Sequence, residues 1–227
     1  MPAEAVIVTG GASGLGAAVA RAASECGLEP VVLDQARPRF EVEHELVDLA
    51  DTRAAESCVR EVAERHGGLR AVVTAAGIDA CGPLTEVAGL AWERVVTVNL
   101  LATAAVLRAA LPYLERTRGR IVTVASTLGL RALPDATAYC ASKFGVVGFT
   151  RALAAELQGR VGVTLLIPGG MRTSFFEARD EQYRPASDAM LNDPADVAAA
   201  VVFALRQPQG CELREVVITP AVEPSWP

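Results

Sequence analysis

Histidine is scarce in this 227-residue sequence, and lysine is scarcer still. The two histidines, His44 and His66, lie near no group of candidate metal ligands, and the five cysteines show neither a Cys-x-x-Cys pair nor a matching histidine spacing. We therefore expect no metal site and a set of reduced thiols, as is typical of a cytoplasmic protein.

Two further absences exclude whole classes of protein. No apolar run reaches the roughly 18 residues that a membrane span needs, and the amino terminus lacks the pattern of a signal peptide, so we predict neither. The formal net charge is -6 and the basic residues are scattered, which argues against a surface for nucleic acid. With 51% hydrophobic residues, the chain can bury a large core.

The rarest residue is also the most informative. Lysine and arginine total 21, and Lys143 is the only lysine, so the other 20 cationic side chains are all arginine. A lysine offers a compact ammonium group on a flexible stem, whereas arginine carries a planar fork. Position 143 therefore requires something that arginine does not supply.

Tyr139 precedes Lys143 by four positions, so on a helix the two side chains share one face. A free tyrosine has a pKa near 10, and lowering it to about 7 takes about 4 kcal/mol. One cation about 4 Å away supplies about that much at an effective dielectric constant of about 20. The pair predicts a phenol that exchanges a proton near neutral pH. The alternative is an ordinary tyrosine and lysine on the surface of a helix.

Short apolar runs alternate with helical patterns throughout the chain. We predict strands at residues 5–9, 30–34, 45–49, 69–75, 120–125, 161–167 and 215–219. We predict helices from the glycine turn to about 26, at 52–66, from 92 through 99 to about 116, and at 193–205. A further helix begins after a cap at Asp135 or Thr137 and runs to about 158. This order predicts one α/β domain over residues 1–227, doubly wound, with a mostly or wholly parallel seven-stranded sheet flanked by helices on both faces.

A glycine-rich turn, GGASGLG at residues 10–16, joins the first strand to the first helix. Glycines let the backbone approach a pyrophosphate, and amide groups at the helix N-terminus hold its charge. Asp34 ends the second strand, where a carboxylate can accept hydrogen bonds from ribose hydroxyls and repel a 2′-phosphate, so NAD is favoured over NADP. Two alternatives stay open: Asp34 forms a turn only, or Arg37 and Arg39 admit NADP.

Three more features belong to the same end of the sheet. Ser126 follows strand 120–125, at the strand end where ligands bind in open α/β sheets. Asn99 is the polar residue of an apolar stretch, so it is a structural hub or part of the site. Residues 171–192, which we call the flap, show no clear period and contain Phe175 and Phe176. We predict that the flap is mobile and covers an apolar substrate.

Together these residues resemble the short-chain dehydrogenase/reductase family over nearly the whole chain. Thr9-Gly10-x-x-x-Gly14-x-Gly16 matches the cofactor turn of that family. Its catalytic tetrad is matched by Asn99, Ser126, Tyr139 and Lys143. Contacts with the cofactor are implied for Gly10, Ser13, Gly14, Leu15, Gly16, Asp34, Asp48, Leu49, Ala76, Gly77, Tyr139, Lys143, Pro168, Gly169, Met171 and Thr173.

The resemblance implies an NAD(P)(H)-dependent oxidoreductase that interconverts a secondary alcohol and a ketone. Tyr139 would pass the proton with its pKa lowered by Lys143 and the oxidised nicotinamide ring, and Ser126 would bind the substrate oxygen. Lys143 would also bind the nicotinamide ribose, and Asn99 would anchor a water beside Lys143. One alternative is a catalytically idle NAD(H)-binding sensor or scaffold. Another is a methyltransferase, which would leave Ser126, Tyr139 and Lys143 unexplained.

Two departures from the family pattern concern the sheet centre and the C-terminus. Thr74-Ala75-Ala76-Gly77 stands where relatives carry Asn-Asn-Ala-Gly, which changes the hydrogen bonding near the middle of the cofactor. The C-terminal strand is followed by a proline-rich tail in place of Val-Asp-Gly-Gly, so contacts through the tail are in question. We still expect a homodimer or homotetramer, assembled through the alanine-rich helices around 100–116 and 138–158.

Overall fold

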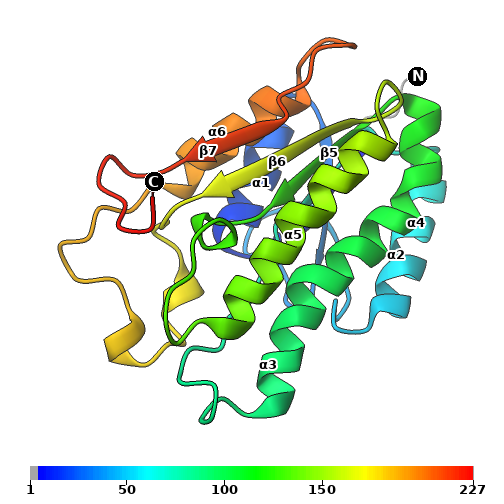
Figure 1. The fold of residues 1–227 in the computed structure, drawn as a ribbon. Helices are drawn as coiled ribbons and strands as arrows, with labels where there is room; N and C mark the ends of the chain where they lie inside the picture. The colour runs from blue at the N-terminus through cyan, green and yellow to red at the C-terminus, as the bar shows by residue number, and fades with distance from the viewer. Residues whose placement is uncertain (1–4, 227) are drawn as a thin grey trace.

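The computed structural model describes residues 5–226 and contains one seven-stranded parallel sheet between two layers of helices (Figure 1). The strands are β1 (Ala5–Thr9), β2 (Glu29–Asp34), β3 (Glu43–Leu46), β4 (Ala71–Thr74), β5 (Arg120–Val124), β6 (Gly162–Pro168) and β7 (Glu215–Ile218). Their order in the sheet is β3-β2-β1-β4-β5-β6-β7. From β1 the chain adds strands first on one side, to β3, and then on the other side, from β4 to β7. This confirms the predicted doubly wound Rossmann fold.

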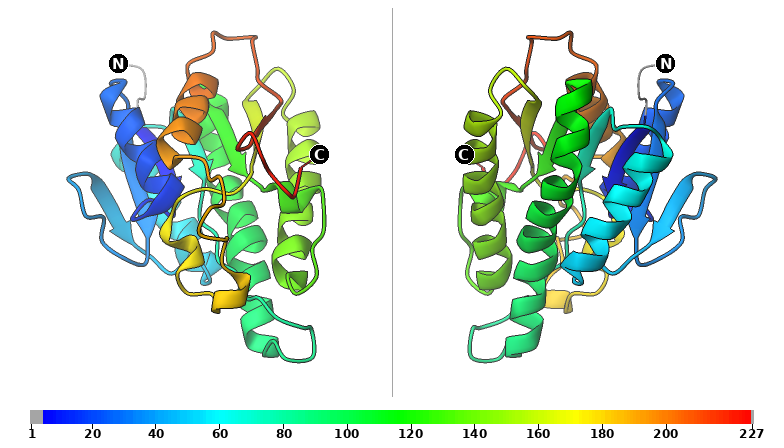
Figure 2. Two further views of the ribbon diagram at one scale, coloured as in Figure 1. Left: turned by 90° about the vertical axis from the view of Figure 1, so that its left-hand side faces the viewer. Right: turned by 90° about the vertical axis from the view of Figure 1, so that its right-hand side faces the viewer.

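Helices cover both faces because side chains of successive strand residues point to opposite sides. Ile7 packs with one core cluster, and Val6 and Val8 pack with the other. Figure 2 shows the two layers from the sides. One layer holds α1 and α6, and the other holds α2, α4 and α5. The helices are α1 (Gly14–Glu25), α2 (Thr52–Arg65), α3 (Gly89–Val96), α4 (Ala102–Thr117), α5 (Thr137–Glu156) and α6 (Pro194–Leu205).

The predicted helical stretch from 92 to 116 is one run that contains a π-helical turn, Thr97–Leu101, between α3 and α4. Asn99 lies in this turn, so the irregular backbone coincides with a predicted site residue. Within residues 5–226, Gly89–Thr117 is the one helix long and apolar enough to cross a membrane by length and composition. The share of its apolar window that is buried inside the protein is 56%, as in a helix that covers a sheet.

The third strand was wrongly predicted at 45–49. It ends at Leu46, because Asp48 forms a turn: its carboxylate accepts a hydrogen bond from the amide of Ala50 at 2.9 Å, and its carbonyl accepts one from the amide of Asp51 at 2.9 Å. Asp48 therefore lies beyond the strand and not at its end. The fourth strand is also shorter than predicted, at Ala71–Thr74.

The N-cap of α5 is a further correction. Ala136 occupies this position and makes no capping bond, whereas the sequence predicts Asp135 or Thr137 as the cap. Asp135 has a left-handed backbone, with φ of 58°, and its carboxylate accepts a hydrogen bond from the Tyr183 hydroxyl at 3.3 Å. The Thr137 hydroxyl accepts one from the Trp92 ring nitrogen at 3.1 Å. Both candidate capping side chains thus make hydrogen bonds with distant residues and do not cap the helix.

Candidate active site

A cavity of about 780 Å³ lies beyond the carboxyl ends of the central strands. Every residue that the sequence predicts to contact the cofactor lines this cavity, from Gly10 after β1 to Thr173 in the flap. Ser126, Tyr139 and Lys143 line it as well. The cavity is therefore the place where the chain brings the predicted cofactor and catalytic residues together.

Two glycines let the turn pack closely against neighbouring backbone. Gly10 has φ of 70°, and a Cβ atom there would lie 2.7 Å from the Cα atom of Ala76. A Cβ atom on Gly16 would lie 2.2 Å from the carbonyl oxygen of Gly10. Ser13, the N-cap of α1, makes no capping hydrogen bond from its side chain. The turn and the first amides of α1 thus fit a pyrophosphate group, which needs backbone donors and no obstructing side chain.

Asp34 ends β2 and lines the cavity, as predicted. Its two carboxylate oxygens accept hydrogen bonds from the amides of Ala12 and Ala36, each at 3.0 Å. The side chain therefore holds the glycine turn in place while it presents negative charge to the cavity. Arg37 and Arg39 do not appear among the described residues that line the cavity.

Asp48 also lines the cavity, and Arg94 lies beside it. An Nη atom of Arg94 lies 3.1 Å from a carboxylate oxygen of Asp48. The hydrogen bond from the Ala50 amide, with help from Arg94, holds the pKa of Asp48 below its usual range. The carboxylate is thus charged at neutral pH, next to Leu49 on the same cavity wall.

Tyr139 and Lys143 lie on one face of α5, as their spacing predicts. The ammonium nitrogen of Lys143 is 5.6 Å from the centre of the Tyr139 ring and donates a hydrogen bond to the Val124 carbonyl at 2.9 Å. Burial lowers the pKa of Lys143 to about 8 and raises the pKa of Tyr139 to about 12. Desolvation is the largest cause of this rise for Tyr139, so the lowering that we expect beside the oxidised nicotinamide ring stays a prediction.

Ser126 lies directly after β5 and caps a 3-10 turn, Thr127–Gly129, by accepting a hydrogen bond from the Leu128 amide at 3.1 Å. Its hydroxyl is also hydrogen-bonded to the Tyr139 hydroxyl, an interaction that acts to lower the pKa of Tyr139. The two hydroxyl groups thus meet at one point of the cavity wall.

Asn99 acts as a hub behind this wall and is not among the residues that line the cavity. Its side-chain amide donates to the Ile78 carbonyl at 2.9 Å and to the Ser142 hydroxyl at 3.0 Å, and its side-chain oxygen accepts from the Ile78 amide at 2.8 Å. A Cβ atom on Gly77 would lie 3.7 Å from both Asn99 Oδ1 and Lys143 Nζ. Asn99 and Lys143 therefore flank the same glycine, and the water between them stays a prediction.

The altered segment after β4 has its own hydrogen bonds. The amide of Ala76 donates to the hydroxyl of Thr9 at 3.2 Å, which ties the end of β4 to β1. The hydroxyl of Thr74 is buried and has no partner among residues 5–226. The altered segment thus leaves one polar group of the sheet centre unpaired.

Sequence reasoning missed several charged residues of the cavity wall, among them Asp79 and Arg179. These two form an ion pair with a distance of 2.5 Å, and the Arg179 guanidinium lies over the rings of Phe175 and Phe176. The Phe175 ring centre is 5.7 Å from that of Tyr139. The position of Asp79, shortly after the end of β4, was the one available signal.

Comparison with known proteins agrees with this fold. A family model described as short chain dehydrogenase matches residues 4–184. L-fucose dehydrogenase from Mus musculus is 31% identical, and the match covers 97% of this chain and 88% of that protein. Glycine betaine reductase ATRR from Emericella nidulans is 30% identical over 97% of this chain, but the match covers only 19% of that longer protein.

A solved structure also matches closely in shape. It is an alcohol dehydrogenase from the archaeon Thermococcus sibiricus complexed with 5-hydroxy-NADP, with a TM-score of 0.84 and 24% identity, covering 94% of this chain and 95% of that one. This likeness agrees with the Rossmann fold of the chain. The chain belongs to the short-chain dehydrogenase/reductase family.

Proposed function

We propose that this protein is an NAD-dependent oxidoreductase that interconverts a secondary alcohol and a ketone, with Tyr139 as the general acid and base. The observation that carries the proposal is the meeting of the Ser126 and Tyr139 hydroxyls at the wall of a cavity whose other end is the glycine turn. L-fucose dehydrogenase, a relative that acts on a sugar, is consistent with chemistry at a carbon that bears a hydroxyl.

The cavity fits a nicotinamide cofactor, which supplies a hydride acceptor or donor when bound. Gly10, Gly14 and Gly16 would lie against the pyrophosphate together with the first amides of α1. Asp34 supports NAD over NADP, because its charge at the end of β2 would repel a 2′-phosphate. Lys143, which lines the cavity, would bind the nicotinamide ribose.

Ser126 and Tyr139 together handle the substrate oxygen. Ser126 donates a hydrogen bond to that oxygen and stabilises the negative charge that develops on it. In reduction Tyr139 donates its proton, and its pKa of about 12 in the free protein means that it carries that proton at neutral pH. In oxidation Tyr139 accepts the proton, helped by Lys143, which with a pKa of about 8 is mostly charged at pH 7.

A direct assay tests this function. Protein, NAD and a panel of secondary alcohols are mixed and the absorbance of NADH is followed, with NADP in a parallel series. Turnover that is faster with NAD than with NADP supports the proposal. Tight binding of NAD without turnover of any alcohol or ketone would favour the alternative, a cofactor-binding sensor or scaffold.

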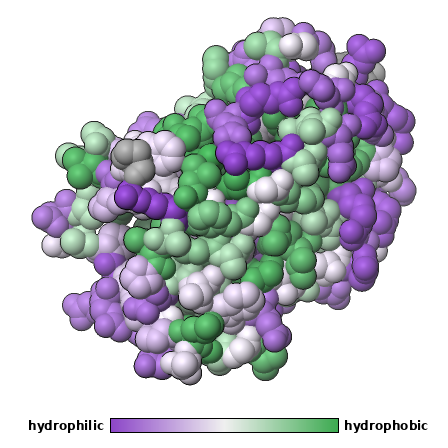
Figure 3. Space-filling view, in the orientation of Figure 1, coloured by the Kyte–Doolittle hydropathy of each residue, from purple (hydrophilic) through white to green (hydrophobic). Residues whose placement is uncertain are grey.

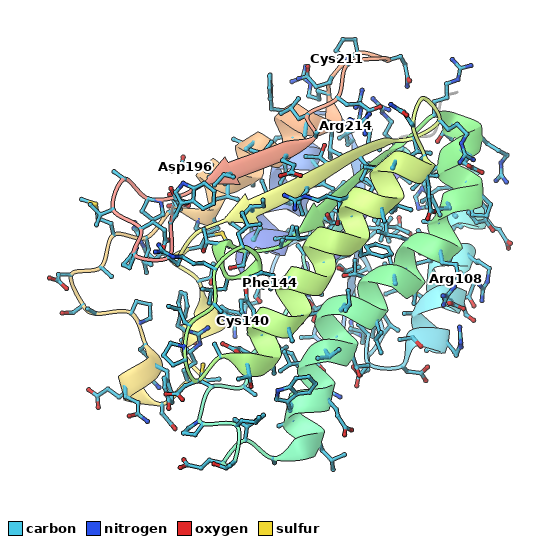
Figure 4. The ribbon with its side chains drawn as sticks, in the orientation of Figure 1. Arg108, Cys140, Phe144, Asp196, Cys211 and Arg214 are labelled. Carbon is cyan, nitrogen blue, oxygen red and sulfur yellow. The ribbon has the colours of Figure 1, made fainter. Side chains whose placement is uncertain are left out.

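The helix layer of α4 and α5 supports a proposal of self-association. Phe144 on α5 is 45% exposed, and Leu101, the last residue of the π-helical turn before α4, is 50% exposed. Figure 4 labels Phe144 on α5, and Figure 3 shows green, hydrophobic residues across the middle of the same view. Sedimentation would show a dimer or a tetramer if this face is covered by a second copy.

A further inference from the structure

The C-terminal tail, residues 219–226, turns back from β7 across the carboxyl ends of the neighbouring strands (Figure 1). Three of its residues, Glu223, Pro224 and Ser225, line the cavity. The tail therefore reaches the site from the far end of the chain. Its sequence showed only a departure from the family ending.

Glu223 holds the turn that follows β6. Its Oε2 atom accepts a hydrogen bond from the Gly170 amide at 2.7 Å, and its Oε1 atom accepts hydrogen bonds from the Ser225 amide at 3.1 Å and the Ser225 hydroxyl at 2.6 Å. A Cβ atom on Gly169 would lie 2.3 Å from Oε2, so the carboxylate lies directly against the backbone of this turn. Hydrogen bonds to a carboxylate are short and strong.

Ser225 holds the loop that carries the catalytic serine. Its side chain is largely buried, and its hydroxyl lies 2.7 Å from the hydroxyl of Thr127, which is also buried. Thr127 follows Ser126 directly in the chain. Through Glu223 and Ser225 the tail thus connects the Ser126 loop after β5 to the Gly169–Gly170 turn after β6.

We infer that the tail is a part of the active site, with Glu223 as a positioning residue for the Gly169–Gly170 turn. This inference rests on the proposed function, in which Pro168 and Gly169 lie against the nicotinamide end of the cofactor. Without Glu223 the turn loses its acceptor and samples more conformations, so it binds the cofactor less tightly. A small misplacement of the reacting groups also slows turnover.

Three variants of the full-length chain test this role. Glu223→Ala removes the acceptor, Glu223→Gln keeps an oxygen for the Gly170 amide, and Val222→Ala is the control, because Val222 is 64% exposed. Calorimetry measures the dissociation constant for NAD, and steady-state kinetics separates kcat from KM. Thermal melting without cofactor verifies that each variant is folded.

We expect Glu223→Ala to weaken NAD binding about 10-fold, because the loss of one charge-assisted hydrogen bond costs about that much. We also expect it to lower kcat. Glu223→Gln should recover most of the affinity, and Val222→Ala should match the parent. If the parent binds NAD and folded Glu223→Ala binds it equally well, the positioning role is overturned while the proposed function stands. If the parent itself binds no NAD, the proposed function fails, and this inference fails with it.

Discussion

The carboxylate of Asp79 and the guanidinium of Arg179 form an ion pair that joins the loop after β4 to the flap. The distance from Asp79 Oδ2 to Arg179 Nη2 is 2.5 Å, and the two side chains are only 5% and 17% exposed. The same guanidinium lies over Phe175, whose ring packs near Tyr139. The ion pair therefore fixes the aromatic wall beside the proposed proton donor.

This pair should influence the pH dependence of the reaction. Asp79 acts to raise the pKa of Tyr139, and Arg179 acts to lower it. Asp79→Asn removes a negative charge and so favours the phenolate, which moves the rise of kcat/KM for alcohol oxidation to lower pH. Arg179→Gln removes a positive charge and should move the same rise to higher pH. Profiles of kcat/KM against pH that shift in the same direction in both variants would contradict this account.

Tyr139→Phe removes the hydroxyl that carries the proton. We expect kcat to fall by about 10² to 10⁴, with little change in the affinity for NAD, since Lys143 and the glycine turn are retained. Steady-state kinetics and calorimetry measure the two quantities. Tyr113→Phe is the matched control, because the Tyr113 hydroxyl bonds the Glu64 carboxylate at 3.2 Å on the α2 and α4 layer. Equal turnover by the two variants would remove Tyr139 from the mechanism.

Burial of Lys143 should show as a dependence of stability on pH. Its pKa is lowered from 10.5 to about 8, so between these values the unfolded chain binds a proton that the folded chain lacks. Raising the pH through this window therefore favours the folded state. Relative to Lys143→Met, the parent should gain up to about 3 kcal/mol in the free energy of unfolding between pH 8 and 10.5. Urea denaturation at several pH values measures this, and parallel curves for parent and variant would refute it.

Asp34→Asn tests the choice of cofactor. The amide keeps an oxygen that can accept from the Ala12 or Ala36 amide, but it carries no charge to repel a 2′-phosphate. We expect the ratio of the NADP to NAD dissociation constants to fall about 10-fold, or about 1.4 kcal/mol. Calorimetric titration with both cofactors gives the ratio. An unchanged ratio would leave Asp34 with a purely structural role in the glycine turn.

Two glycine variants separate the cofactor turn from general helix stability. Gly16→Ala places a methyl group 2.2 Å from the Gly10 carbonyl oxygen, so it should distort the turn, cost about 1–3 kcal/mol and abolish NAD binding. Gly148→Ala in α5 meets no atom within 4 Å and should stabilise the protein by about 0.5–1 kcal/mol. Thermal melting and NAD titration check both variants. Normal NAD binding by Gly16→Ala would mean that the turn does not hold the cofactor.

The fold and the main site residues could be predicted because they follow local rules. The strands are recognisable from their apolar runs, and the spacing of Tyr139 and Lys143 places them on one helix face. Of the two main errors, one has a local cause and the other a tertiary cause. The third strand ends at Leu46 because Asp48 forms a turn, and the cap of α5 was missed because Tyr183 and Trp92 occupy the candidate side chains.

By itself the sequence determined the order of the elements, the glycine turn and the residues at the strand ends, because each depends on neighbours a few positions away. Only the tertiary structure decided which distant groups meet there. Arg179 reaches Asp79 across 100 positions, and Glu223 reaches Gly170 across 53. It also decided that the pKa of Tyr139 is raised in the free protein, because desolvation depends on the atoms packed around a group and not on its neighbours in the chain.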